Sequence, residues 1–305
     1  MSIQEALALA QADPALSIPA PDPIGRLYRY PDSEPLPTGP NGGIILPSEE
    51  EILANVRNGC WLPSITNVLG VVGQEHLVGW AARKATRTAI EIVKKHPESI
   101  TRNPAGALRY ISTAHTRDRD NAARQGTQVH YAAELLSVGK EVPEGLLNSK
   151  ERGYVAQWQR WADTFQPEFL HLESTVYGKA GGLPYAGTTD FICKINGIVV
   201  GGDLKTTRSG ISSSVAYQLS AVRHADSLAV DTSKLVDMPT LDATYVLHLT
   251  EHDYTFAPLW TTGETWDSFK SMRQLWDGWV LGVSTLSGHA LVQPATTSPD
   301  QVLPL

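Results

Sequence analysis

The strongest constraint on the fold is a pair of short apolar runs joined by the dipeptide Asn196-Gly197. Residues 191–195 precede this dipeptide and residues 198–200 follow it, and both runs are apolar and contain β-branched residues. Asn-Gly favours the positive φ angles of a tight two-residue turn, while β-branched residues favour strands. The sequence therefore predicts an antiparallel hairpin in which the numbers of paired residues sum to roughly 393.

This hairpin brings charged side chains together. Asp190 comes level with Asp203 on the neighbouring strand. Because side chains alternate along a strand, Asp203 and Lys205 share one face about 6 to 7 Å apart, and Leu204 faces the other way. Two nearby carboxylates repel each other unless a cation lies between them, and oxygen ligands favour Mg²⁺ or Mn²⁺. Lys205 could then stabilise negative charge on a phosphate. The alternative is an ordinary cross-strand charge set on a solvated face.

The flanking residues extend the pattern. A Gly187-Thr188-Thr189-Asp190 segment precedes the hairpin, Thr206 follows Lys205, and a predicted helix over 212–229 contains Gln218. The whole resembles the PD-(D/E)XK nuclease superfamily, in particular its RecB-like and phage exonuclease branch. The segment 126–130 with Glu134 resembles the helix that supplies a histidine ligand in this branch. Segments 62–70 and 77–80 resemble phage-encoded members, so the resemblance spans roughly residues 62–260.

The resemblance implies a role for each matching residue. Asp190, Asp203 and the Leu204 carbonyl would be metal ligands, and Lys205 would be the catalytic lysine. His130 would complete the metal shell. Two further positions match less closely: Gln218 would help to hold the site and the DNA, and Glu173 would be an outer acid.

Simpler interpretations of these residues stay open. His130 could be a helix histidine bonded to Glu134, four residues along the same face. Gln218 could be a surface glutamine, and Glu173 could have a structural role. The chain also departs from the branch, because Val222 stands where a tyrosine is frequent; Tyr217 is a candidate substitute. Iron–sulphur members use four cysteines, whereas this chain has two, so no iron–sulphur cluster is expected.

These features predict a Mg²⁺- or Mn²⁺-dependent deoxyribonuclease, and the resemblance implies an exonuclease of phage-type DNA recombination, repair or replication. The expected partner is DNA, and the resemblance adds a single-strand annealing protein or a helicase. The chain has no Walker A loop, so ATP-driven unwinding would need another protein. The alternatives are a non-catalytic DNA-binding or assembly protein that keeps the nuclease fold, and a structure-selective endonuclease.

A second histidine motif is not expected to bind metal. His248-Leu249-Thr250-Glu251-His252 has the spacing of a zinc-peptidase motif, which requires a helix. The apolar runs at 243–249 and 254–260 instead predict a second hairpin with its turn at 251–253.

Chain length and the positions of Pro, Gly and helix-capping residues predict the organisation of the chain. A chain of 305 residues with 42% hydrophobic content can bury one large core. We expect an α/β domain with a restriction-endonuclease-like central mixed sheet, flanking helices and a helical N-terminal elaboration. Residues 1–45 are rich in Pro and Gly and should be extended or disordered. A single nuclease domain would occupy 46–287, with its catalytic core at about 115–260, and 288–305 would form a loose tail. Helices are expected at about 48–57, 74–95, 104–113, 117–138, 150–166, 212–229 and 264–285.

Charge and hydropathy bear on partners and compartment. No apolar run is long enough to span a membrane, no secretory signal is expected, and two cysteines suit a reducing cytoplasm, which would be the host's for a phage-encoded protein. The net charge of −7 disfavours DNA binding. However, basic residues cluster before His130 and could form a basic wall beside the site: Arg83, Lys84, Arg87, Lys94, Lys95, Arg102, Arg109, Arg117, Arg119 and Arg124. The alternative is that they are solvated helix faces.

Overall fold

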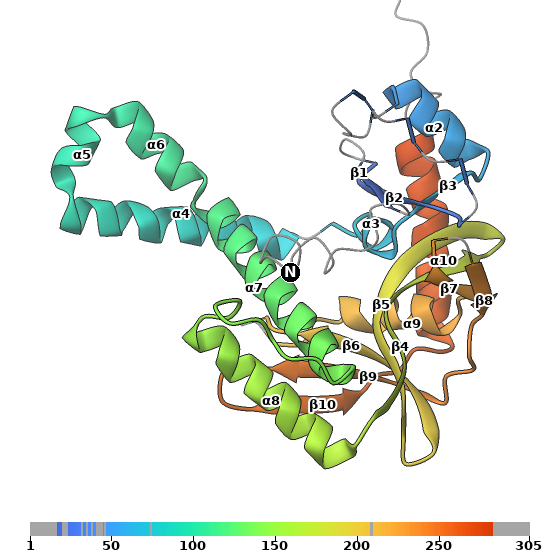
Figure 1. Cartoon of the computed structure of the whole chain (residues 1–305). Helices are drawn as coiled ribbons and strands as arrows, with labels where there is room; N and C mark the ends of the chain where they lie inside the picture. The colour runs from blue at the N-terminus through green and yellow to red at the C-terminus, as the bar shows by residue number, and fades with distance from the viewer. Residues whose placement is uncertain are drawn as a thin grey trace, which may run out of the picture.

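The centre of the protein is a mixed β-sheet flanked by helices, which confirms the predicted α/β class (Figure 1). The computed structural model describes residues 17–19, 24–31, 33–34, 36–37, 39–40, 45, 47–73, 75–207, 210–232 and 234–282. Within them, seven strands have the order β10-β9-β6-β5-β4-β7-β8. Their bounds are β4 Glu168–Ala180, β5 Leu183–Ile195, β6 Ile198–Lys205, β7 Ser227–Asp231, β8 Lys234–Asp237, β9 Ala243–Leu249 and β10 Tyr254–Pro258. Only β6 and β9 pair in parallel among these described strands.

The two predicted hairpins are confirmed. In the first, Phe191 pairs with Gly202 and Ile195 with Ile198, which is the register that the Asn196-Gly197 turn predicts. Asn196 and Gly197 have φ angles of +50° and +84°, as such a turn requires. In the second, β9 pairs with β10 across residues 250–253.

A second, smaller sheet comes from the N-terminal part of the chain. It joins β1 (Ser17–Pro19), β2 (Arg26–Arg29) and β3 (Trp61–Pro63). The described part of 1–45 is thus partly extended, and Leu27 and Tyr28 are buried, so packing begins before residue 46. Residues 1–16 and the expected tail at 288–305 lie outside the described residues.

The helices follow the predicted order. Their bounds are α2 Glu49–Arg57, α3 Ile65–Leu69, α4 Glu75–Lys95, α5 Pro97–Arg102, α6 Pro104–Ser112, α7 Ala114–Ser137, α8 Ser149–Phe165, α9 Ser214–Arg223, α10 Glu264–Trp276 and the π-helical turn η1 Asp277–Leu281. Ser48 and Glu51 form a capping box at the start of α2. The prediction of a helix to residue 229 is wrong, because residues from Ser227 onward form β7 and pair with β4 and β8.

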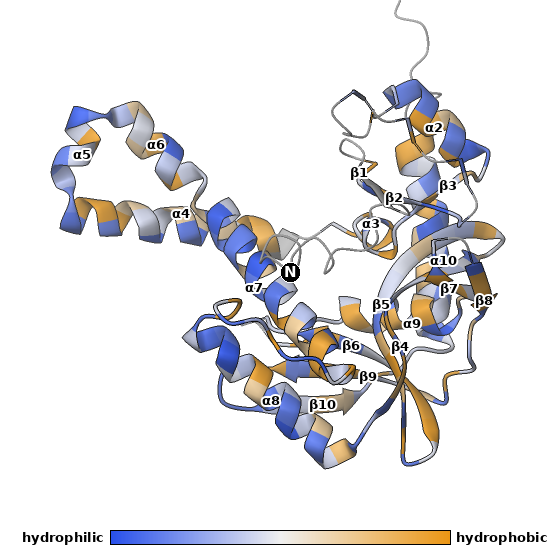
Figure 2. Ribbon diagram, in the orientation of Figure 1, coloured by the Kyte–Doolittle hydropathy of each residue, from blue (hydrophilic) through white to orange (hydrophobic). Residues whose placement is uncertain are grey.

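Helices cover both faces of the sheet. Along β5, Phe191 and Cys193 pack toward α7 and α8, whereas Ile192 packs toward α9 and α10. This alternation is expected of a strand buried on both sides. Figure 2 shows that α7 is hydrophilic in its first half and more apolar where it meets the sheet, and its second half contains the buried Val129 and Leu135.

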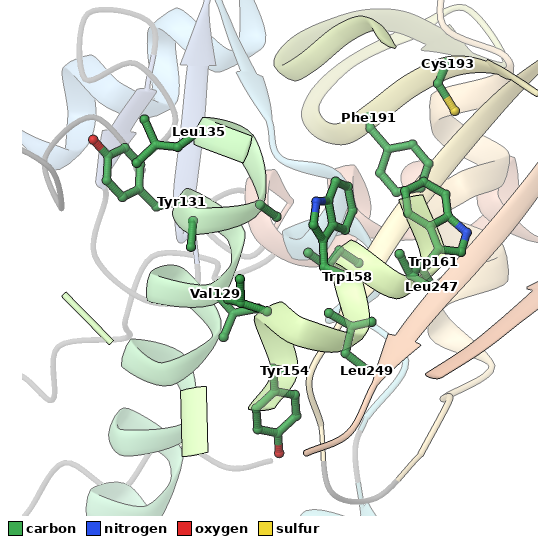
Figure 3. Packing of buried hydrophobic residues seen from close by; sticks show 14 of the residues in the cluster. Val129, Tyr131, Leu135, Tyr154, Trp158, Trp161, Phe191, Cys193, Leu247 and Leu249 are labelled. Carbon is green, nitrogen blue, oxygen red and sulfur yellow. The ribbon is translucent and has the colours of Figure 1, made fainter. Parts of the chain in front are cut away.

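Aromatic rings fill the core under α8. Trp161 is fully buried and lies 5.5 Å from Phe191 and 5.4 Å from Phe256, measured between ring centroids. Figure 3 shows Trp158 and Trp161 of α8 facing Phe191 of β5 and Leu247 of β9. Among the described residues, no helix has both the length and the apolar character needed to cross a membrane.

The core makes a direct prediction about stability. Replacing Trp161 by Ala leaves a cavity among five aromatic side chains, and we expect a loss of about 3–5 kcal/mol in the free energy of unfolding. Urea unfolding followed by circular dichroism measures this loss. Trp260→Ala is the matched control, because this Trp is 87% exposed and should change stability by less than about 0.5 kcal/mol. Equal effects of the two substitutions would contradict the packing described.

Candidate metal centre

The candidate site lies where β4, β5 and β6 meet the second half of α7. Each element contributes polar groups: His130 from α7, Glu173 from β4, Asp190 from β5, and Asp203 to Lys205 from β6. The structure thus brings together all but one of the residues that the resemblance singled out; Gln218 is the exception.

The backbone of Leu204 joins two of these elements to β6. Its amide donates a hydrogen bond to Asp190 Oδ2 at 2.6 Å. Its carbonyl oxygen lies 2.9 Å from His130 Nε2, and that ring nitrogen donates to it. The predicted histidine and the predicted carbonyl ligand therefore face each other. The alternative in which His130 bonds Glu134 is not what the structure shows, because both ring nitrogens have other partners.

Glu173 contacts the second ring nitrogen of this imidazole. Its Oε1 lies 3.2 Å from His130 Nδ1. Along β4, Glu173 falls between the pairs Leu172–Phe191 and Ser174–Thr189, which places it opposite Asp190. Its φ angle of +43° is unusual for a residue with a side chain, and such backbone is frequent at functional sites. Sequence reasoning gave no hint of this conformation.

Three of these side chains form a group that fits a metal ion. His130, Glu173 and Asp190 each offer one ligand atom, and these atoms all lie within 4.8 Å of one another. All three side chains are partly buried, with 13–27% exposed. Two carboxylates and a nearby carbonyl oxygen suit Mg²⁺ or Mn²⁺, whereas a single imidazole does not select one metal.

Asp203 and Lys205 form an ion pair beside this group. Lys205 Nζ lies 2.7 Å from Asp203 Oδ1, and the Asp203 side chain is only 2% exposed. Within the described residues, the other carboxylate oxygen, Oδ2, is buried without a hydrogen-bond partner. Because a buried charged oxygen is costly to leave unpaired, this atom is a further candidate ligand.

Gly202 sets the close approach of the two acidic strands. A Cβ atom built there would lie 1.9 Å from the ring of Phe191, so only glycine leaves room for this ring. Phe191 follows Asp190 and Gly202 precedes Asp203, so a side chain at 202 would push the two carboxylates apart. A glycine inside a strand is the signal that could have identified this contact.

Gln218 and the second histidine motif lie elsewhere. Gln218 is partly buried on α9, and among the described residues no hydrogen bond or ion pair links it to the acids. Val222 belongs to the core. His248 lies in β9 and donates from Nε2 to the Thr207 carbonyl at 2.7 Å, and His252 follows in the turn. The motif is not helical, as predicted.

The charges of the site shift one another's pKa values. Burial alone lowers the pKa of His130, but Asp190 and the hydrogen bond with Glu173 outweigh burial and raise it to about 9. Burial raises the pKa of Asp203 to about 6, although the Lys205 ammonium opposes this shift. Burial likewise raises the pKa of Asp190. For Lys205, burial lowers the pKa, but Asp203 and Asp190 outweigh it, and the pKa is raised.

Comparison with known proteins adds little. No family model matches the chain, and no curated protein matches it either. The solved structure of SSO0001 shares 12% sequence identity over 51% of this chain and 73% of its own, with a TM-score of 0.27. A similarity this low supports no argument about fold or function, so the site is judged on its own residues.

The raised pKa of His130 predicts that metal binding releases a proton. Without metal, the imidazole is protonated at neutral pH, because its pKa is about 9, and a histidine must lose this proton before it can bind a metal. We expect Mn²⁺ affinity to rise by about tenfold per pH unit between the ordinary histidine pKa and pH 9. Titration calorimetry in two buffers of different protonation enthalpy counts the proton.

His130→Gln is the control for this prediction. It keeps a polar side chain but has no titratable group, so the proton release should disappear and the remaining affinity should become less dependent on pH. A binding heat for the unsubstituted protein that is the same in both buffers would contradict the prediction.

Proposed function

We propose that this protein is a metal-dependent DNA nuclease with a PD-(D/E)XK core, acting as an exonuclease in DNA recombination, repair or replication. The observation that supports this best is the convergence of His130, Glu173 and Asp190 on one point beside the Asp203–Lys205 pair. The identification of the superfamily and of exonuclease activity rests on the sequence resemblance.

The residues present fit a divalent metal. His130, Asp190 and the Leu204 carbonyl would hold it, with the unpaired oxygen of Asp203 as a further ligand. Of the three converging side chains, Glu173 would not bind the metal itself but would orient the imidazole through Nδ1, as outer carboxylates commonly do for metal-bound histidines. When bound, such a metal lowers the pKa of water and polarises phosphate oxygens.

Lys205 would act on the phosphate directly. Its raised pKa keeps the ammonium charged at neutral pH, and its side chain is 26% exposed, whereas Asp203 is nearly closed off. The ammonium therefore has access to a substrate while Asp203 anchors it. A fixed positive charge in a partly dehydrated site stabilises the charge that develops on the phosphate in the transition state.

The buried charges disfavour a purely structural role. Asp190 and Asp203 are both shielded from water, and burial raises the pKa of each. A protein that only scaffolds DNA gains nothing from holding two such carboxylates together, since removing charge from the interior is often neutral or stabilising. A nuclease needs them.

Hydrolysis of end-labelled linear DNA and covalently closed circular DNA tests this proposal. We expect loss of the linear substrate alone, with Mg²⁺ or Mn²⁺ and not with EDTA, because an exonuclease requires an end. Asp190→Asn should abolish this activity. Lys205→Ala should reduce it by about 10²- to 10³-fold, the usual effect of removing one charge-stabilising donor.

Lys194→Ala is the matched control for the lysine substitution. Lys194 is exposed on β5 beside the Asn196-Gly197 turn, at the end of the hairpin away from the acidic residues, so its removal should leave the rate of hydrolysis unchanged. Cleavage of the circle would indicate an endonuclease. Intact DNA in every metal, with DNA binding retained, would exclude the nuclease and favour the non-catalytic alternative.

A further inference from the structure

Helices α4, α5 and α6 form an arm that projects from the body of the protein (Figure 1). In this view the arm extends away from the sheet and returns to it through α7. Two contacts fasten α4 to α7: Lys84 Nζ lies 2.6 Å from Asp118 Oδ2, and Trp80 packs edge-on against His115 at 6.3 Å between centroids. The arm therefore has a defined position on the same helix that holds His130.

The arm and the first half of α7 have a net positive charge, whereas the rest of the chain has a net negative charge. Residues 75–124 contain ten Arg and Lys and five Asp and Glu, a net charge of +5, within a chain whose net charge is −7. The remaining residues together therefore have a net charge of −12. A separation of charge this large within one chain favours contact with an extended anion on the basic side.

Most of the basic residues of this surface are available to a ligand. Within the described part of the chain, only Lys84 and Arg119 of this set form ion pairs, and Arg117 stacks on Tyr110 at 3.8 Å. The others are exposed and make no ion pair among the described residues: Arg83, Arg87, Lys94, Lys95, Arg102, Arg109 and Arg124.

Three of these cations form a row along α4. Arg83 and Arg87 are four residues apart, and Lys94 is seven residues further, so all three lie on one side of the helix. The like charges of Arg83 and Arg87, four residues apart, destabilise an isolated helix. The row spans about 16 Å, which matches about five successive nucleotides of a strand at 3.4 Å each.

The position of the row determines how many nucleotides would separate it from the metal centre. Lys84 fixes the start of the row beside Asp118, and Asp118 precedes His130 by twelve residues on one continuous helix. Twelve residues of α-helix span about 18 Å, or about five nucleotides. A strand that occupied the metal centre would therefore reach the row after about five nucleotides. Because α4 crosses α7 at an angle (Figure 1), the strand would reach the far end of the row after at most about ten nucleotides.

We propose that the α4–α6 arm is a nucleic-acid-binding surface that holds the phosphate backbone of DNA between about five and ten nucleotides from the metal centre. This inference rests on the proposed function, because the distance is measured from the metal centre. The binding surface itself is inferred from the charge and geometry of the arm. The arm contacts phosphates through Arg83, Arg87 and Lys94, so it adds affinity without reading sequence.

The arm also has exposed apolar residues, including Ile90 of α4, which lies on the same side of the helix as Arg87 and Lys94. Such residues could indicate contact with a second copy of the chain. The adjacent row of cations disfavours that pairing, because an antiparallel contact between two α4 helices would bring like charges together. Charge therefore favours DNA over a second copy as the occupant.

Fluorescence anisotropy with labelled oligonucleotides in EDTA tests the arm without hydrolysis. For the unsubstituted protein, the affinity for DNA should rise as the part of the oligonucleotide that extends beyond the metal centre is lengthened from about five to about ten nucleotides. In the triple variant Arg83→Gln, Arg87→Gln, Lys94→Gln, this rise should disappear, and the dissociation constant for longer DNA should increase by at least about tenfold. The slope of the logarithm of the affinity against the logarithm of the salt concentration should become shallower by about two to three, because three phosphate contacts are lost.

The matched control is Lys179→Gln, Lys194→Gln, Lys234→Gln, which removes the same charge from exposed positions on β4, β5 and β8. It should bind DNA as the unsubstituted protein does. Mn²⁺ titration verifies that both triple variants keep the metal centre, and circular dichroism verifies that they fold.

The outcomes separate the arm from the catalytic proposal. If the arm variant and the control bind equally, the inference is overturned even where the protein hydrolyses DNA. If DNA is never hydrolysed but binding depends on the arm, the inference stands and the nuclease proposal fails. A dimer that the arm variant breaks, with unchanged DNA affinity, would assign the arm to a second copy and overturn the inference.

Discussion

The two hydrogen bonds of the Leu204 backbone determine whether a site exists at all. The amide holds Asp190 and the carbonyl faces His130, so β6 fixes a side chain of β5 and a side chain of α7 at once. Both bonds depend on register. A slip of one residue along the β5–β6 pair would turn every side chain to the opposite face, and Asp190 would then point away from its partners. The tight turn at Asn196-Gly197 makes such a slip costly, because its φ angles fit only these two positions.

Local turn chemistry explains why this part of the molecule could be predicted from sequence. The hairpin and its register follow from the Asn196-Gly197 turn, and the common face of Asp203 and Lys205 follows from the alternation of side chains along a strand. The roles of Glu173 and Phe191 could not be derived in the same way. Glu173 reaches the imidazole because β4 pairs with β5 and because its own backbone is left-handed, and neither property has a signal in the adjacent residues. Likewise, the ring that covers Gly202 comes from the neighbouring strand.

Non-local pairing also explains where the fold prediction fell short. Residues 227–229 continue an apolar pattern after α9, and the pattern alone does not distinguish a longer helix from a strand. Pairing with β4, some fifty residues earlier, decides in favour of β7. The same holds for β2, whose partner β3 lies more than thirty residues later. The Pro-rich composition of this region predicts an extended chain but not the partner against which Leu27 and Tyr28 are buried.

The charges of the site form a balance that a metal would change. Three carboxylates, of Glu173, Asp190 and Asp203, surround one ammonium and one imidazole. A proton on His130 brings the group close to neutrality, and this is why the pKa of the imidazole is raised although burial opposes the charged form. A divalent cation would satisfy the same carboxylates better than a proton does, because it carries twice the charge and accepts several oxygens at once. Metal and proton would therefore compete for one position, and the protonated arrangement described here would be the one from which a metal binds.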